Sequence, residues 1–230
     1  SRLLICLVSM IALGSECLAH PDLIDQIDRQ SSILEQDPDN LDALLTRGDL
    51  YRRHGEYQQS AADFSRARDI APADRRLNWF EGLLALNTFD YEKSNRLFTQ
   101  YLEDSAEHAA GWYWRGKARV GLGQYPAAAE DFSRAIETNS RPSPALYRAR
   151  VLALTASGSV RYEEATVAVN EGLAHFPGEV NLLGLSVDIA LASSDTRTAL
   201  MSLQRVNKPV LELPQWRLRQ GLWHCIEGDA

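Results

Sequence analysis

The stretch LLTRGDLYRRHGEYQQSAADFSRARDIAP, residues 44–72, decides the fold because its pattern returns twice further along the chain. A glycine, a tyrosine and a phenylalanine of this stretch each recur at an interval of 34 residues. The three sets are Gly48, Gly82 and Gly116; Tyr57, Tyr91 and Tyr125; and Phe64, Phe98 and Phe132. A fixed period of this length predicts one supersecondary unit that is stacked on copies of itself.

The quoted stretch predicts two helices joined by a short turn at Gly55-Glu56, with approximate bounds 42–54 and 58–71. Gly48 lies inside the first helix, where glycine costs roughly 1 kcal/mol relative to alanine. A glycine at such a place indicates that the second helix approaches closely. Phe64 is expected to fill the wider gap toward the next unit. The small residues expected to face the glycine are Ser60 or Ala61, and Ala67.

The residues at repeat spacing carry a family resemblance. In the first unit they are Gly48, Tyr51, Gly55, Tyr57, Phe64, Ala67 and Pro72. In the third unit they are Trp112, Gly116, Gly123, Tyr125, Ala128, Phe132 and Ala135. This pattern resembles the tetratricopeptide repeat and covers most of residues 41–228. The resemblance implies an all-α fold, an α-α superhelix or solenoid of helix–turn–helix units. It also implies a concave groove that is lined by the first helices and holds a peptide or an extended segment of another protein.

The repeat divides the rest of the chain into expected parts. Beyond Ser140 the pattern weakens: Ala149 takes the place of the glycines, and about four extra residues fall in the turn at 156–161. The expected parts are a signal peptide at 1–19, an N-terminal capping helix at 20–40, and five units at 41–206 (41–74, 75–108, 109–140, 141–178 and 179–206). Residues 207–230 are expected to form a connector and the first helix of a sixth, incomplete unit.

The N-terminal segment has the layout of a secretory signal. Arg2 precedes an apolar run of eleven residues, LLICLVSMIAL, and small residues at Cys17 and Ala19 offer a cleavage site before His20. A membrane anchor would need about 20 apolar residues, and a lipoprotein signal at Cys17 would need a lipobox, which is missing. We therefore expect an exported, periplasmic or secreted protein of bacterial type, without stable membrane insertion once the signal is cleaved.

Composition and motifs argue against several function classes. The formal net charge of −7 disfavours binding to nucleic acid, which needs a basic face. The five histidines are scattered, and neither a metal-ligand pair nor a phosphate-binding glycine loop is found. The sequence therefore predicts no catalytic, cofactor or metal site. Cleavage would leave Cys225 as the last cysteine, which excludes an intrachain disulfide, and we expect this side chain to be buried.

The function is expected to reside on the concave groove. The predicted protein-binding residues, taken from the repeat register, are Asp49, Arg53, Trp79, Leu83, Tyr113, Lys117 and Arg150. Trp, Tyr and Arg dominate binding hot spots, and the cations suit carboxylates of an acidic ligand. The alternative for Trp79 and Tyr113 is that they merely pack between helices. A non-enzymatic scaffold that binds a protein or peptide is the resulting prediction.

A self-associating structural subunit of a cell-envelope assembly is the alternative function. The helix at 215–227 carries more apolar residues than one buried face needs. Either these side chains pack on a partner or on another copy, with Trp216 and Trp223 foremost, or the natural chain continues past Ala230. The apolar residues are Trp216, Leu218, Leu222, Trp223 and Ile226.

Overall fold

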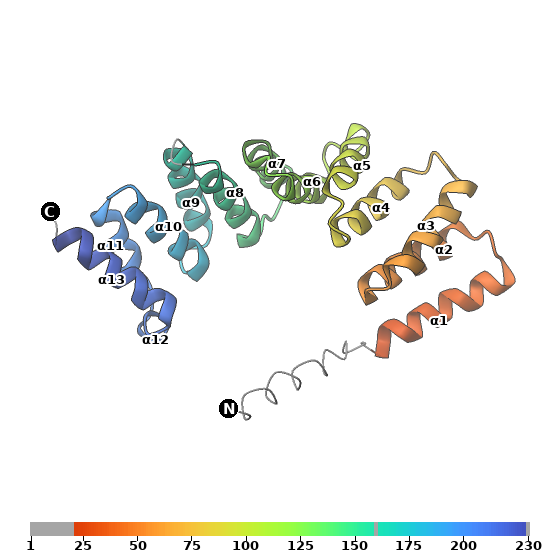
Figure 1. Ribbon diagram of the computed structural model, residues 1–230, viewed down its shortest axis with the longest axis horizontal. Helices are drawn as coiled ribbons and strands as arrows, with labels where there is room; N and C mark the ends of the chain where they lie inside the picture. The colour runs from red at the N-terminus through yellow and green to blue at the C-terminus, as the bar shows by residue number, and fades with distance from the viewer. Residues whose placement is uncertain (1–20, 159–160, 229–230) are drawn as a thin grey trace, which may run out of the picture. The chain divides into compact units, whose positions relative to one another are not determined.

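The computed structural model describes residues 21–158 and 161–228, so the predicted signal peptide at 1–19 lies outside the described part. The described residues form α-helices and no strand, which confirms the predicted all-α array of helix–turn–helix units (Figure 1). The helices are α1 Pro21–Gln36, α2 Leu41–His54, α3 Tyr57–Ile70, α4 Arg75–Asn87, α5 Tyr91–Glu103, α6 Ala109–Gly121, α7 Tyr125–Glu137, α8 Pro144–Ala156, α9 Tyr162–His175, α10 Val180–Ala192, α11 Thr196–Gln204, α12 Lys208–Leu211 and α13 Pro214–Gly228.

The chain divides into two compact units, which meet within α4 between Phe80 and Glu81. In the first unit α1 packs against α2, and α2 packs against α3. In the second unit each helix from α5 to α11 packs against the next, and α13 packs against α10 and α11. The two helices predicted at 42–54 and 58–71 agree with α2 and α3 to within one residue.

The eighth residue of each first helix holds the pair together. In α2 and α6 this residue is Gly48 or Gly116, and a phenylalanine stands at the eighth position of the following helix. A Cβ atom at Gly48 would lie 2.4 Å from Cε1 of Phe64, and one at Gly116 would lie 2.7 Å from Cε1 of Phe132. Because the glycine has no side chain, the phenylalanine ring of the second helix of the same pair packs directly against the backbone of the first helix. The expectation that small residues face Gly48 is wrong in this respect.

Phe64 also reaches the next helix, as the sequence predicts, because its ring stacks on Phe80 of α4 at a centroid distance of 5.8 Å. One buried ring thus joins three helices of the first unit.

The fourth pair uses a different combination of side chains at the same place. The connection before α8, residues 138–143, is one residue longer than the connection before α6, residues 104–108, so the repeat interval becomes 35. Val151 rather than Ala149 is therefore the equivalent of Gly116, which corrects the sequence assignment. Val151 and its counterpart Val169 in α9 are both buried. A glycine and a large ring are replaced by two medium-sized side chains, which conserves the packed volume.

The turn between the helices of the fourth unit is longer than in the third unit, as predicted, but by two residues rather than about four, because residues 157–161 separate α8 from α9. The shorter turn between α6 and α7 comprises residues 122–124. Gly158 has φ of +98°, a conformation that favours glycine and allows the wider turn.

The two tryptophans of the last helix, α13, do not have the role that the sequence predicts. Trp216 is the third residue of α13, a position that is buried in all the preceding first helices, and only 2% of Trp216 is exposed. Trp223 is half-buried, and its Nε1–H donates to the Thr196 carbonyl at 2.9 Å. Both rings therefore pack on their own chain. The exposed apolar side chains are Leu218 and Leu222, and Cys225 is exposed, contrary to expectation.

Replacing Gly116 with alanine should lower the free energy of unfolding by about 1–3 kcal/mol, because the added methyl group overlaps the Phe132 ring. Gly221 stands at the same eighth position of α13, and a Cβ atom there would meet no neighbour within 4 Å. Gly221→Ala should therefore raise the free energy of unfolding by about 0.5–1 kcal/mol through helix propensity alone. Urea unfolding followed by circular dichroism measures both changes.

A double variant tests whether the side chains at the two eighth positions can compensate for each other in volume. Gly116→Val combined with Phe132→Val copies the Val151 and Val169 combination, and it should recover stability that Gly116→Val alone loses. Equal stability of wild type and Gly116→Ala would contradict the packing argument.

Candidate functional site

Two adjoining hollows lie on the face formed by the first helices of the second unit. We call them the central hollow, between α6 and α8, and the α12 hollow, between α8, α10 and α13. The central hollow has a volume of about 360 Å³, and the α12 hollow about 340 Å³. Arg148 and Leu152 line both hollows, so the two form one surface, which we call the first-helix groove.

Tyr113 and Lys117 line the central hollow, as the predicted groove requires. They are the fifth and ninth residues of α6, and the residues in the same places in α8 are Arg148 and Leu152. The Tyr113 ring lies edge-on to Trp114 at 4.9 Å and tilted to Phe132 at 5.9 Å. It is half-buried. Tyr113 therefore both packs between helices and contributes to the wall of the hollow.

The two cations of the central hollow, Lys117 and Arg148, are exposed. Neither side chain has a hydrogen-bond or ion-pair partner within the described part of the chain. The residues that line the central hollow include no Asp or Glu. The site therefore carries positive charge that its own chain does not neutralise, and it offers this charge beside aromatic and apolar surface.

Arg150 does not join Tyr113 and Lys117, contrary to the sequence prediction. Its Nη1 lies 2.8 Å from Oε2 of Glu171, and it lines a different hollow together with Glu130 and Val167. Arg150 would occupy the place of Lys117 only if the repeat interval between α6 and α8 were 33 residues. The interval is 35 residues. With the observed interval, Arg150 is the seventh residue of its helix, and Arg148 takes the groove position.

Seventh residues connect first and second helices elsewhere in the chain. Arg115 of α6 holds Asp131 of α7 with Nε–Oδ2 and Nη2–Oδ1 distances of 3.1 and 2.7 Å, and Asp131 is buried. Arg119 adds a third contact to Asp131 at 3.0 Å, and burial lowers the pKa of Arg119 from its ordinary value. The pair is structural, because its charges are turned toward each other inside the helix pair.

The first unit repeats this arrangement. Arg47 holds Asp63 at 2.8 and 2.7 Å, and the hydrogen bond from Arg47 to Asp63 raises the pKa of Arg47. Ser31 and Thr99 accept the remaining guanidinium bond in the two units. Sequence reasoning missed these pairs, although an Arg followed by an Asp 16 residues later occurs at the same repeat position in both.

The other predicted groove residues have varied surroundings. Asp49 forms an ion pair with Arg52 at 2.8 Å. Arg53 is exposed and Trp79 is half-buried, and both belong to the first unit with Asp49. Leu83 is buried and belongs to the second unit. A groove that joins these residues to Tyr113 and Lys117 stays a prediction.

Residues 21–158 and 161–228 include neither a cluster of metal-binding side chains nor a helix suited to crossing a membrane. No group of three or more His, Cys, Asp or Glu side chains in this part comes close enough to hold a metal ion. Among the helices of the same part, none combines the length and the apolar character needed to cross a bilayer.

Known proteins share both the sequence pattern and the fold. The family model of the tetratricopeptide repeat matches residues 31–75, 81–145 and 115–174. No curated protein matches the sequence. The structure of PilW, described as a widely conserved type IV pilus biogenesis factor, has a TM-score of 0.70 at 17% identity, and the match covers 86% of this chain and 90% of PilW.

Two further structures have the same fold. YrrB, described as a TPR protein with an unusual peptide-binding site, has a TM-score of 0.68 at 15% identity, over 87% of this chain and 99% of YrrB. MamA from Desulfovibrio magneticus RS-1 has a TM-score of 0.62 at 13% identity, over 71% of this chain and 91% of MamA. Identities this low establish similarity of fold alone.

Proposed function

Because the chain belongs to the tetratricopeptide repeat family, we propose that it is a non-enzymatic scaffold whose first-helix groove binds a peptide or an extended segment of another protein. Proteins of this family generally act as protein–protein interaction scaffolds. The observation that carries the proposal is the pair of unpartnered cations, Lys117 and Arg148, beside the Tyr113 ring in a hollow of about 360 Å³.

The charge of the groove favours an acidic partner. The whole chain has a formal net charge of −7, yet the central and α12 hollows are lined by no acidic side chain and by the unpartnered cations Lys117 and Arg148. A local positive surface attracts the carboxylates of an acidic partner. Tyr and Arg at the centre are residue types that contribute most to binding energy.

Neutralising the two groove cations should abolish binding. We expect the Lys117→Gln and Arg148→Gln double variant to lose capture of the partner that wild type retains from an envelope extract, as measured by affinity purification and mass spectrometry. Arg150→Gln is the matched control, because Arg150 lies two residues away in α8 but lines another hollow. Because exposed charges are screened by salt, capture should also weaken as ionic strength rises.

The groove proposal would be abandoned if the double variant captured the same partner as well as Arg150→Gln does. Urea unfolding of both variants beside wild type verifies that folding is retained. Substitutions at exposed residues such as Lys117 and Arg148 change the free energy of unfolding by about 0.5 kcal/mol or less.

A second candidate function, self-association, is favoured by one face of α13. Leu218, Gly221, Leu222 and Cys225 follow one another at helical spacing, and all four are exposed. Gly221 leaves space for close approach of another helix. A two-fold axis would place this face of one copy against the same face of another, which is the commonest arrangement of homodimers.

If a second copy covers this face, the sedimentation coefficient of the wild-type protein should rise with concentration, and Leu218→Ser with Leu222→Ser should remove the dependence. Met201→Ser, at an exposed apolar residue of α11, is the control and should still self-associate. A wild-type protein that stays monomeric at every concentration would exclude this function.

Export from the cytoplasm is the remaining part of the proposal. Its support is the sequence of residues 1–19, a short basic start followed by an apolar run and small residues before His20. An exported protein could reach its partner in the periplasm or outside the cell.

Intact mass of the protein from the periplasmic fraction should correspond to a chain that begins at His20. Ala19→Phe should block processing, because signal cleavage needs a small residue at that place. A cytosolic product that keeps residues 1–19 would refute export.

A further inference from the structure

The connector between α11 and α13 departs from the repeat. Other connections between helix pairs in the second unit comprise residues 104–108, 138–143 and 176–179, whereas residues 205–213 include the additional helix α12. The side chain of Asn207 caps α12 by accepting from the Val210 N–H at 3.1 Å, and Pro214 begins α13. The connector therefore has a defined conformation rather than serving only as a spacer.

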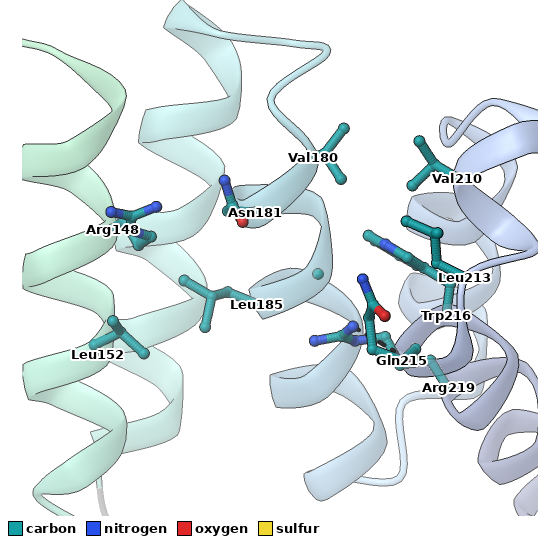
Figure 2. A pocket seen from close by; sticks show the side chains of 11 residues that line it. Arg148, Leu152, Val180, Asn181, Leu185, Val210, Leu213, Gln215, Trp216 and Arg219 are labelled. Atoms are coloured by element: carbon teal, nitrogen blue, oxygen red, sulfur yellow. Dashed lines mark hydrogen bonds between the residues drawn. The ribbon is translucent and has the colours of Figure 1, made fainter. Parts of the chain in front are cut away.

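The connector forms one wall of the α12 hollow. Figure 2 shows Val210 and Leu213 on one side, Val180 and Leu185 of α10 in the middle, and Leu152 of α8 on the other side. Leu213 is 44% exposed and Leu152 is 47% exposed, so the hollow presents apolar side chains to solvent. Exposed apolar surface within a concavity is typical of a site that receives an apolar group.

One of the two arginines that line the α12 hollow keeps a charge that its own chain does not neutralise. Asp188 accepts two bonds from Arg219, at 2.7 and 2.6 Å, and the guanidinium lies 4.8 Å from the centre of the Trp216 ring. Arg219 is thereby fixed and neutralised. Arg148 stands where the α12 hollow meets the central hollow and retains an unpartnered charge, as Lys117 does further along.

We propose that the α12 hollow receives a large apolar side chain of an acidic polypeptide segment, whose carboxylate pairs with Arg148 and Lys117 in the central hollow. This inference rests on the proposed function, since it concerns the ligand of the same groove. A polypeptide fits better than a small anion, because the two hollows share Arg148 and Leu152 and extend over the four first helices α6, α8, α10 and α13. Charge complementarity selects an acidic segment over a basic one.

The probe is a display library of random dodecapeptides, selected on the purified protein. Enriched peptides should contain at least one Asp or Glu together with a large apolar residue. In fluorescence polarisation with a synthetic peptide of the enriched sequence, Leu213→Ser and Leu185→Ser should each weaken binding about tenfold or more, as loss of apolar contact area at one anchor predicts. Val167→Ser, at an exposed apolar residue outside both hollows, should leave affinity unchanged.

Combining a substitution in the peptide with a substitution in the protein identifies which groups contact each other. Replacing the apolar peptide residue with alanine should weaken binding to wild type but have little further effect on Leu213→Ser, because both changes remove the same contact. A peptide in which Lys replaces the acidic residue should regain affinity for Arg148→Glu.

The outcomes separate this inference from the function on which it rests. A selection that yields no binding peptide overturns both. Peptides whose binding depends on Lys117 and Arg148 but is unaffected by Leu213→Ser and Leu185→Ser overturn the apolar anchor alone. Enrichment of basic peptides overturns the assigned ligand chemistry.

Discussion

The contact between the eighth residues of paired helices is the constraint on which the rest of the structure depends. Gly48 and Gly116 bring the first helix against the ring of Phe64 or Phe132, and Val151 and Val169 occupy the same place with redistributed volume. Because close packing leaves no space for an additional methyl group, the side chains at the two positions must match each other in volume. The rotation of each first helix about its axis is then fixed, and so is the face that each remaining residue occupies.

This fixed rotation explains why neighbouring arginines of one helix have different roles. Arg150, the seventh residue of α8, points toward α9 and pairs with Glu171, whereas Arg148, the fifth residue, lies in the groove. Seventh residues face the partner helix in other pairs too: Arg47 and Arg115 hold carboxylates, and Ser186 and Ser202 share a hydrogen bond of 2.9 Å. A residue at this position stabilises the pair, whereas the fifth and ninth residues of α6 and α8 line the central hollow.

The sequence is sufficient for the parts of the structure that follow from a regular period. The helix bounds of the first unit, the glycine positions and the longer turn after α8 all follow from residue spacing. The position of Arg148 does not, because the sequence assignment took an interval of 33 residues before α8, whereas the interval is 35, and two residues correspond to about 200° around a helix. Tyr113 and Lys117 precede that change of interval, so the period assigns them to the face where the structure has them. The number of apolar residues in α13 indicates that Trp216 packs on a partner, which is wrong. Trp216 is buried within its own chain because it stands at the third position of α13.

The groove acquires its individual character where the repeat is interrupted. Regular pairs differ in surface side chains but share the same backbone, so they provide similar shallow faces. The connector with α12 adds Val210 and Leu213 as a wall that no other described pair has, and Arg148, the fifth residue of α8, lines the same hollow and the central one. Apolar and cationic surface are therefore adjacent where the connector departs from the period. Specificity requires such differences between units, since the contacts that maintain the stack are the same in each.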